Sequence, residues 1–123
     1  NVSFLGNLSH SQIKKVFSES QLLFLPSSSE GFPKVILEAA AARIPCILYE
    51  SYGADEWIKN KHNGFIISEF DQAVLLVKEL IDRPELLEDV SNNTKQLAKS
   101  FDWKEVIKSW EREILILINK KKS

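Results

Sequence analysis

The chain has 123 residues, 44% of them hydrophobic and 27% charged, which is the size and composition of one globular domain. Its 16 lysines and arginines and 17 aspartates and glutamates give a net charge of −1, so we expect no nucleic acid partner. The single cysteine, Cys46, excludes an internal disulfide. With no membrane-spanning apolar run and no signal peptide in the first residues, the chain is expected in the cytoplasm.

Four short apolar runs predict parallel strands, because each is nearly continuous rather than alternating, as in strands covered on both faces. The runs are residues 2–5, 22–25, 46–49 and 65–67. Helical patterns separate them: one begins at a Ser9-x-x-Gln12 capping box, a second covers 33–43 and a shorter third covers 53–59. This alternation predicts an α/β fold, a doubly wound parallel sheet with right-handed crossovers. Since such sheets usually have about five strands or more, we expect further strands upstream of Asn1.

Three helices are predicted after the last strand, at 70–83, 84–100 and 102–119. Residues 1–67 are thus expected to form an α/β core and residues 68–123 a helical part of the same domain. The last helix has one apolar stripe, which is expected to pack on another surface. The stripe consists of Trp103, Val106, Ile107, Trp110, Ile114 and Leu117.

The loop at 26–33 is the most informative, because ligands of open parallel sheets bind beyond the carboxyl ends of the strands. It places the carboxylate of Glu30 and the permissive Gly31 immediately before a helix. Pro33 suits the first helical position and would leave the amides of Lys34 and Val35 unpaired at the positive end of the helix dipole. Such amides favour a phosphate, whereas the alternative is an ordinary helix start without a ligand.

Glu38 lies in the middle of an almost entirely apolar helix, where a carboxylate is costly unless it is paired or hydrogen-bonded. Two explanations stay open: an ion pair with Lys34 one turn earlier, or hydrogen bonds to the vicinal hydroxyls of a ligand in the crevice. Glu30 and Glu38 together also suggest the acid and base pair of a glycosidase. No metal site is predicted, because His10 and His62 are isolated and lack ligand spacing.

These motifs follow one another in an order that resembles a known family. The residues concerned are 2–6, 25–27, Glu30-Gly31-Phe32-Pro33-Lys34-Val35-Ile36-Leu37-Glu38-Ala39, Pro45, 53–56, 63–65 and Phe101-Asp102-Trp103. The chain resembles the C-terminal, donor-binding half of the retaining nucleotide-sugar glycosyltransferases, glycosyltransferase family four, whose two-domain GT-B fold has Rossmann-like halves. The paired glutamates in their Glu-Gly-Phe-Pro context carry most of this resemblance.

The resemblance implies a transferase that moves a hexose from a nucleoside diphosphate sugar to a hydroxyl acceptor with retention of anomeric configuration. Glu30 matches the catalytic glutamate, which contacts the transferred sugar and stabilises its developing positive charge. Gly31 and Phe32 match the residues whose backbone amides contact that sugar. Lys34 and Val35 match those whose amides bind the diphosphate.

Two further positions are implied at the nucleotide end of the donor. Glu38 matches the glutamate that holds the ribose hydroxyls, and Leu8 lies where the family contacts the base. The family needs neither metal nor cofactor, because protein amides and cationic side chains stabilise the leaving diphosphate. The leaving phosphate helps to deprotonate the acceptor, so no dedicated base is implied. Bacterial members typically assemble polysaccharides or glycolipids, which is an association rather than a derivation.

Two positions depart from the family pattern. Pro33 replaces a glycine found in many members and removes one backbone donor. Arg43 replaces a glycine after the helix, where a left-handed cap is unfavourable for arginine, so we expect that turn to differ. The basic clamp of the diphosphate and the acceptor-binding domain are expected upstream of Asn1. This chain alone should therefore be inactive, and its unpaired sheet edge should favour a dimer.

A second hypothesis is a non-catalytic nucleotide-sugar-binding or protein-interaction module that keeps the fold. In this hypothesis a partner covers the stripe that contains Trp103 and Trp110, or the stripe lies on a membrane surface with the help of the lysines at 120–122. For the full-length enzyme, the resemblance likewise allows peripheral association with the inner face of the membrane.

Overall fold

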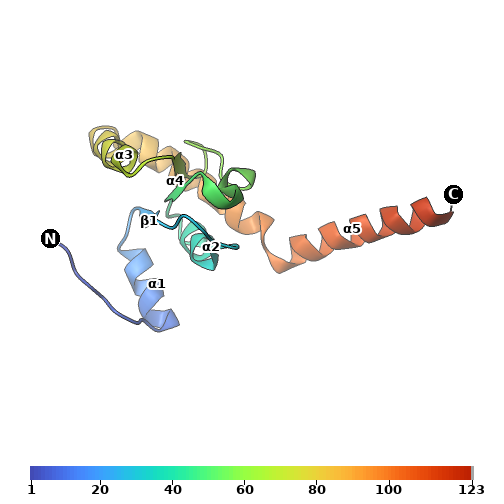
Figure 1. Cartoon of the computed structure of the whole chain (residues 1–123). Coiled ribbons are helices and arrows are strands. Elements are labelled where there is room, and N and C mark those ends of the chain that lie inside the picture. The colour runs from blue at the N-terminus through green and yellow to red at the C-terminus, as the bar shows by residue number, and fades with distance from the viewer. Residues whose placement is uncertain (123) are drawn as a thin grey trace.

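The computed structural model describes residues 1–122 and shows a small parallel sheet with helices around it and one long helix that leaves the body (Figure 1). The elements in order are α1 (His10–Ser18), β1 (Leu23–Leu25), α2 (Lys34–Ala41), β2 (Cys46–Tyr49), the 3-10 helix η1 (Ser51–Glu56), β3 (Phe65–Ile67), α3 (Phe70–Asp82), α4 (Pro84–Ser100) and α5 (Trp103–Lys122). The predicted α/β class, with a parallel sheet followed by C-terminal helices, is confirmed.

The sheet has the strand order β1-β2-β3, and both pairs are parallel. Alternate residues of the central strand enter two separate apolar clusters, which explains why the run 46–49 is apolar throughout. Cys46 and Leu48 pack with Ile36 of α2, whereas Ile47 packs with Phe65 and the buried face of α3. Both faces of the sheet are therefore covered by helices.

The predicted strand at 2–5 is wrong. Within the described residues this segment pairs with no other strand, and its side chains are exposed, with Phe4 at 98% exposure. A strand forms only where a neighbour completes its backbone hydrogen bonds. An apolar run is therefore not sufficient by itself to form a strand. The sheet has three of the four predicted strands, and the open edge of β1 receives no partner in the described chain.

The local helix signals are mostly confirmed. The amide of Gln12 donates to Ser9 Oγ over 3.3 Å and the amide of Ser9 donates to Gln12 Oε1 over 2.8 Å, which is the predicted capping box of α1. The helix predicted at 53–59 is instead the shorter η1, because Tyr52 and Gly53 adopt left-handed dihedrals inside it. An α-helix cannot continue through two such residues.

The expectation that the turn at Arg43 differs from a left-handed cap is wrong. Arg43 has φ of 63°, and the amides of Arg43 and Ile44 donate to the carbonyls of Ala40 and Ala39 over 3.0 and 2.8 Å, as in a Schellman motif. The side chain explains why arginine is tolerated there. Its guanidinium donates to Asn92 Oδ1 of α4, so a contact with the neighbouring helix offsets part of the backbone strain.

The apolar stripe of α5 is uncovered in the described chain, so its predicted packing is not found. No residue of α5 is buried, and Trp103 and Trp110 are 74% and 67% exposed. The helix extends away from the body beyond the end of α4 (Figure 1). None of the described helices combines the length and the apolarity required to cross a bilayer.

Candidate functional site

The loops after β1 and β2 lie at one edge of the sheet, because neighbouring parallel strands end on the same side. The loop after β1 carries Glu30, which is half-buried, and Gly31, which is exposed and has open space beside its Cα. Within residues 1–122 no hydrogen bond or ion pair reaches the Glu30 carboxylate. The predicted catalytic side chain therefore stands unpaired at the edge where ligands of such sheets bind.

The N-terminus of α2 is open. Pro33 has extended dihedrals (φ −76°, ψ 104°) and is the N-cap, so the helix begins at Lys34, one residue later than predicted. The amide of Ile36 donates to the carbonyl of Pro33 over 3.1 Å, but the amides of Lys34 and Val35 have no partner in the described chain. Pro33 has no side-chain oxygen with which to cap them. Two free amides, the helix dipole and an exposed lysine make this end attractive for an anion.

An aromatic cluster fixes the loop immediately before α2. The ring centroid of Phe32 lies 5.0 Å from that of Trp57 and 4.7 Å from that of Phe101. Tilted pairs at such distances contribute about 0.5–1.5 kcal/mol each beyond their burial. The side chain of Phe32 is thereby anchored, and the backbone of this predicted site residue is held in place beside Gly31. The sequence motifs included Phe32 and Phe101 but contained no signal that the two touch.

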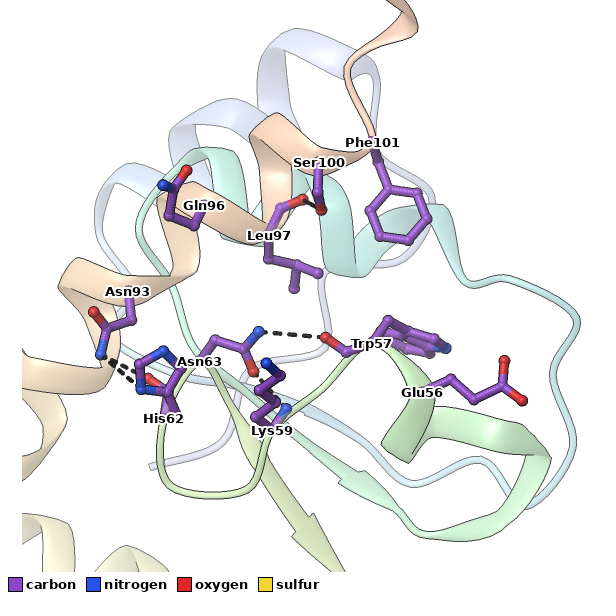
Figure 2. Close-up of a pocket in the computed structure, with 10 residues that line it drawn as sticks. All are labelled: Glu56, Trp57, Lys59, His62, Asn63, Asn93, Gln96, Leu97, Ser100 and Phe101. Atoms are coloured by element: carbon purple, nitrogen blue, oxygen red, sulfur yellow. Dashed lines mark hydrogen bonds between the residues drawn. The ribbon is translucent and has the colours of Figure 1, made fainter. Parts of the chain in front are cut away.

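Two members of this cluster, Trp57 and Phe101, also border a cavity of about 410 Å³ between α4 and the loop before β3. Figure 2 shows Trp57 and Phe101 at one end of this cavity and His62 with Asn93 at the other. The carboxamide of Asn93 donates to the carbonyl of His62 over 3.0 Å, and that of Asn63 donates to the carbonyl of Trp57 over 3.3 Å. No residue predicted for the site lines this cavity, which the sequence did not indicate.

Glu38 lies on the face of α2 that is turned toward α1. It lines a cavity of about 340 Å³ with residues of α1 that include His10, Lys14 and Phe17. The ion pair with Lys34 that the sequence left open is not formed in the described chain. Of the predicted site residues, Glu38 alone lines this cavity.

Most of the remaining predicted residues lie beside Glu30 because they are its neighbours in the sequence. Gly31, Phe32, Lys34 and Val35 adjoin Glu30, so the structure brings these five together. Lys34 lies one turn before Glu38 on the same exposed face of α2. Leu8 is half-buried and lies immediately before the N-cap of α1. Residues 30–35 thus lie together around the start of α2, whereas Glu38 lines the cavity with α1.

Sequence reasoning missed two residues in the loop after β2. The hydroxyls of Ser51 and Tyr52 are buried and have no hydrogen-bond partner in the described chain. Burial raises the pKa of Tyr52 above its ordinary value, and the negative charge of Glu30 raises this pKa further. Tyr52 therefore lies within electrostatic reach of the predicted catalytic carboxylate. The only sequence signal was that the loop 50–56 follows a predicted strand.

A known family and several known proteins match this chain. The family model described as "Glycosyl transferases group 1" matches residues 1–97. An uncharacterized glycosyltransferase of Haemophilus influenzae is 28% identical over 98 residues, which are 77% of this chain and 28% of that protein. An alpha-1,4-N-acetyl-D-galactosaminyltransferase of Campylobacter jejuni is 31% identical over 113 residues, 89% of this chain and 31% of that protein.

Solved structures agree in fold. Anabaena HepE in complex with UDP-glucose has a TM-score of 0.69 at 20% identity and is matched over 89% of this chain and 30% of its own. Sucrose-phosphate synthase of Thermosynechococcus elongatus has a TM-score of 0.78 at 17% identity, and the match covers 96% of this chain and 30% of that protein. The chain spans 28% and 31% of the lengths of the two curated relatives above.

Proposed function

The chain belongs to the group 1 glycosyl transferases, and on this premise we propose that it forms the donor-binding half of an enzyme that transfers a sugar from a nucleoside diphosphate sugar to a hydroxyl acceptor. We further propose that the transferred sugar is a hexose and that its anomeric configuration is retained. The Anabaena relative in fold was solved with UDP-glucose, which supports a nucleotide sugar as the donor.

The observation that carries this proposal is the juxtaposition of Glu30 with the open N-terminus of α2. A donor of this class has a sugar at one end of a diphosphate, so it needs groups for hydroxyls and groups for anionic oxygens side by side. The free amides of Lys34 and Val35 suit the diphosphate. The unpaired carboxylate of Glu30 and the exposed backbone of Gly31 suit the sugar.

In the proposed reaction Glu30 stabilises the positive charge that develops on the sugar as the bond to the diphosphate lengthens. A fixed carboxylate next to a developing cation lowers the barrier because it needs no reorganisation during the reaction. The amides of Gly31 and Phe32 orient the sugar, and the aromatic anchoring of Phe32 keeps them in position. The leaving diphosphate is stabilised by the end of α2, so we propose that the reaction needs no metal ion.

We assign the nucleoside to the cavity between α1 and α2. Glu38 lines this cavity and offers a carboxylate for the two ribose hydroxyls. This carboxylate is available because it forms no ion pair with Lys34 in the described chain. His10 and Lys14 lie across the cavity from it. Leu8, just before α1, is the proposed apolar contact of the base.

The acceptor is proposed to bind to a second domain of the complete enzyme. The shared stretch is only 28% and 31% of the lengths of the two matched relatives, which supports a larger working unit. We therefore propose that this chain by itself binds donor weakly and does not transfer sugar. We also propose that the complete enzyme associates with a membrane surface and that this chain forms a dimer.

A non-catalytic interaction module is the second candidate function, and the bare apolar stripe of α5 favours it. The two candidates differ in what Glu30 does. In the enzyme, Glu30→Ala abolishes sugar transfer, whereas in a module it leaves the binding of the partner intact.

Titration of the chain with UDP, GDP and ADP, followed by amide chemical shifts, tests the proposal. We expect the largest shifts at the amides of residues 31, 32 and 34–38, since Pro33 has no amide proton. Uridine, guanosine and adenosine are the matched controls, because they lack the diphosphate and should leave the amides of Lys34 and Val35 unchanged. Shifts confined to other parts of the chain would refute the assignment.

A further inference from the structure

The two buried hydroxyls after β2 require an explanation. Buried polar groups in folded proteins almost always have partners, because a group that loses water without a replacement destabilises the fold. The ring of Tyr52 packs against the apolar cluster under α2, which includes Ile36 and Cys46. The ring is therefore held by ordinary packing, while its hydroxyl has no partner in the described chain.

The backbone at Tyr52 is also strained. Its dihedrals are left-handed (φ 54°, ψ 27°), a conformation that crowds the Cβ of any residue except glycine. Gly53 continues the turn with φ of 73°, which glycine adopts without steric strain. Strained residues persist where the surrounding structure forces them and are frequent at functional sites. Tyr52 thus combines a strained backbone with an unsatisfied hydroxyl at the ligand-binding edge of the sheet.

The complementary group is Glu30. Its carboxylate accepts no hydrogen bond within residues 1–122. Burial raises the pKa of the Tyr52 phenol, and the negative charge of Glu30 raises this pKa further. The two residues follow β1 and β2, which are hydrogen-bonded neighbours. A donor without an acceptor and an acceptor without a donor therefore lie at the same edge of the sheet.

We propose that Tyr52 is a positioning residue, whose hydroxyl donates a hydrogen bond to the Glu30 carboxylate once the donor sugar occupies the site. This inference rests on the proposed function and deepens it. Hydrogen bonds to catalytic groups are often long or unmade in the empty site and tighten when the substrate binds. A bond to the charged carboxylate keeps Glu30 ionised and directed at the sugar, where its charge acts on the developing cation.

Kinetics of Tyr52→Phe in the complete transferase test the inference. This change removes only the hydroxyl, so kcat should fall about tenfold or more, the value expected for a hydrogen bond to a charged group, while KM for the donor stays within about twofold. The unfolding midpoint should stay equal or rise, because an unsatisfied buried hydroxyl is removed. Tyr49→Phe, which removes the other phenol of the chain, is the matched control and should leave kcat unchanged.

An ionisation measurement tests the contact without any activity. In a Tyr49→Phe background Tyr52 is the one remaining tyrosine, so its phenolate is followed directly by absorbance. Glu30→Gln removes the negative charge that opposes ionisation, so the pKa of Tyr52 should fall. An unchanged pKa would overturn the inference, as would a Tyr52→Phe enzyme with the kcat of an active wild type. A wild-type enzyme that uses no nucleoside diphosphate sugar would instead overturn the proposed function.

Discussion

The ring of Phe32 packs against the ring of Phe101, with their centroids 4.7 Å apart, and this contact ties the loop before α2 to the end of α4. Phe101→Ala should therefore loosen the backbone of Gly31 and Phe32. We expect donor affinity to fall a few-fold and the free energy of unfolding to fall by about 1–2 kcal/mol. Calorimetric titration and urea unfolding measure the two effects.

Phe70→Ala is the matched control for this prediction. Phe70 also belongs to a tilted aromatic pair, with Phe24 at 6.0 Å, but it lies at the start of α3, outside the loop before α2. Its loss should leave donor affinity unchanged. Equal loss of affinity in both variants would show that general destabilisation, rather than anchoring of the loop, is responsible.

Glu30→Gln should separate charge from shape at the proposed catalytic position. The amide has the size of the carboxylate and can still contact sugar hydroxyls, so donor affinity should change by no more than a few-fold. The negative charge beside the developing cation is lost, so kcat of the complete transferase should fall by roughly a hundredfold or more. Steady-state kinetics with the donor varied give both values, and an unchanged kcat would exclude Glu30 from the chemistry.

Glu38→Ala should weaken nucleotide binding without touching the chemical step. Loss of the two hydrogen bonds that the ribose hydroxyls donate to this carboxylate should lower the affinity for nucleoside diphosphates by about tenfold or more. Glu88→Ala removes an exposed glutamate from α4 and should have no effect. Titration calorimetry on the two variants measures both affinities, and equal affinities would refute the assignment of Glu38 to the ribose.

Arg43 offers a test of backbone strain. Arg43→Ala keeps a Cβ at φ of 63° and loses the guanidinium contact with Asn92, so it should destabilise the fold. Arg43→Gly loses the same contact but relieves the strain, so it should be more stable than the alanine variant by about 1 kcal/mol. Urea unfolding of the two variants measures this difference, and equal stabilities would show that the turn carries no strain.

Local signals in the sequence were sufficient for most of the helices and for the three strands that form. The predicted bounds of β2, β3 and α4 agree with the structure, because turn residues and Pro84 limit these elements locally. The capping box at Ser9 likewise depends on residues within one turn. By contrast, the segment 2–5 has the composition of a strand, but strand formation depends on a neighbour that composition cannot reveal.

Contacts between distant segments account for what the sequence could not predict at the site. Glu30 and the open amides of α2 were predictable because they are adjacent in one motif. The unpaired hydroxyl of Tyr52 depends on how the loops after β1 and β2 come together, and the cavity beside Glu38 depends on how α1 packs near α2. No periodicity encodes either arrangement.

The open end of α2 is the proposed binding site for the diphosphate of the donor, and a pair of substitutions at Lys34 tests this role most directly. Lys34→Pro removes the first helical amide at a position that tolerates proline, since the preceding Pro33 is already extended. Lys34→Ala removes the charge but keeps this amide. We predict that Lys34→Pro binds UDP, GDP or ADP, whichever the wild type prefers, about tenfold more weakly than Lys34→Ala. Equal affinity of the two variants would contradict the account.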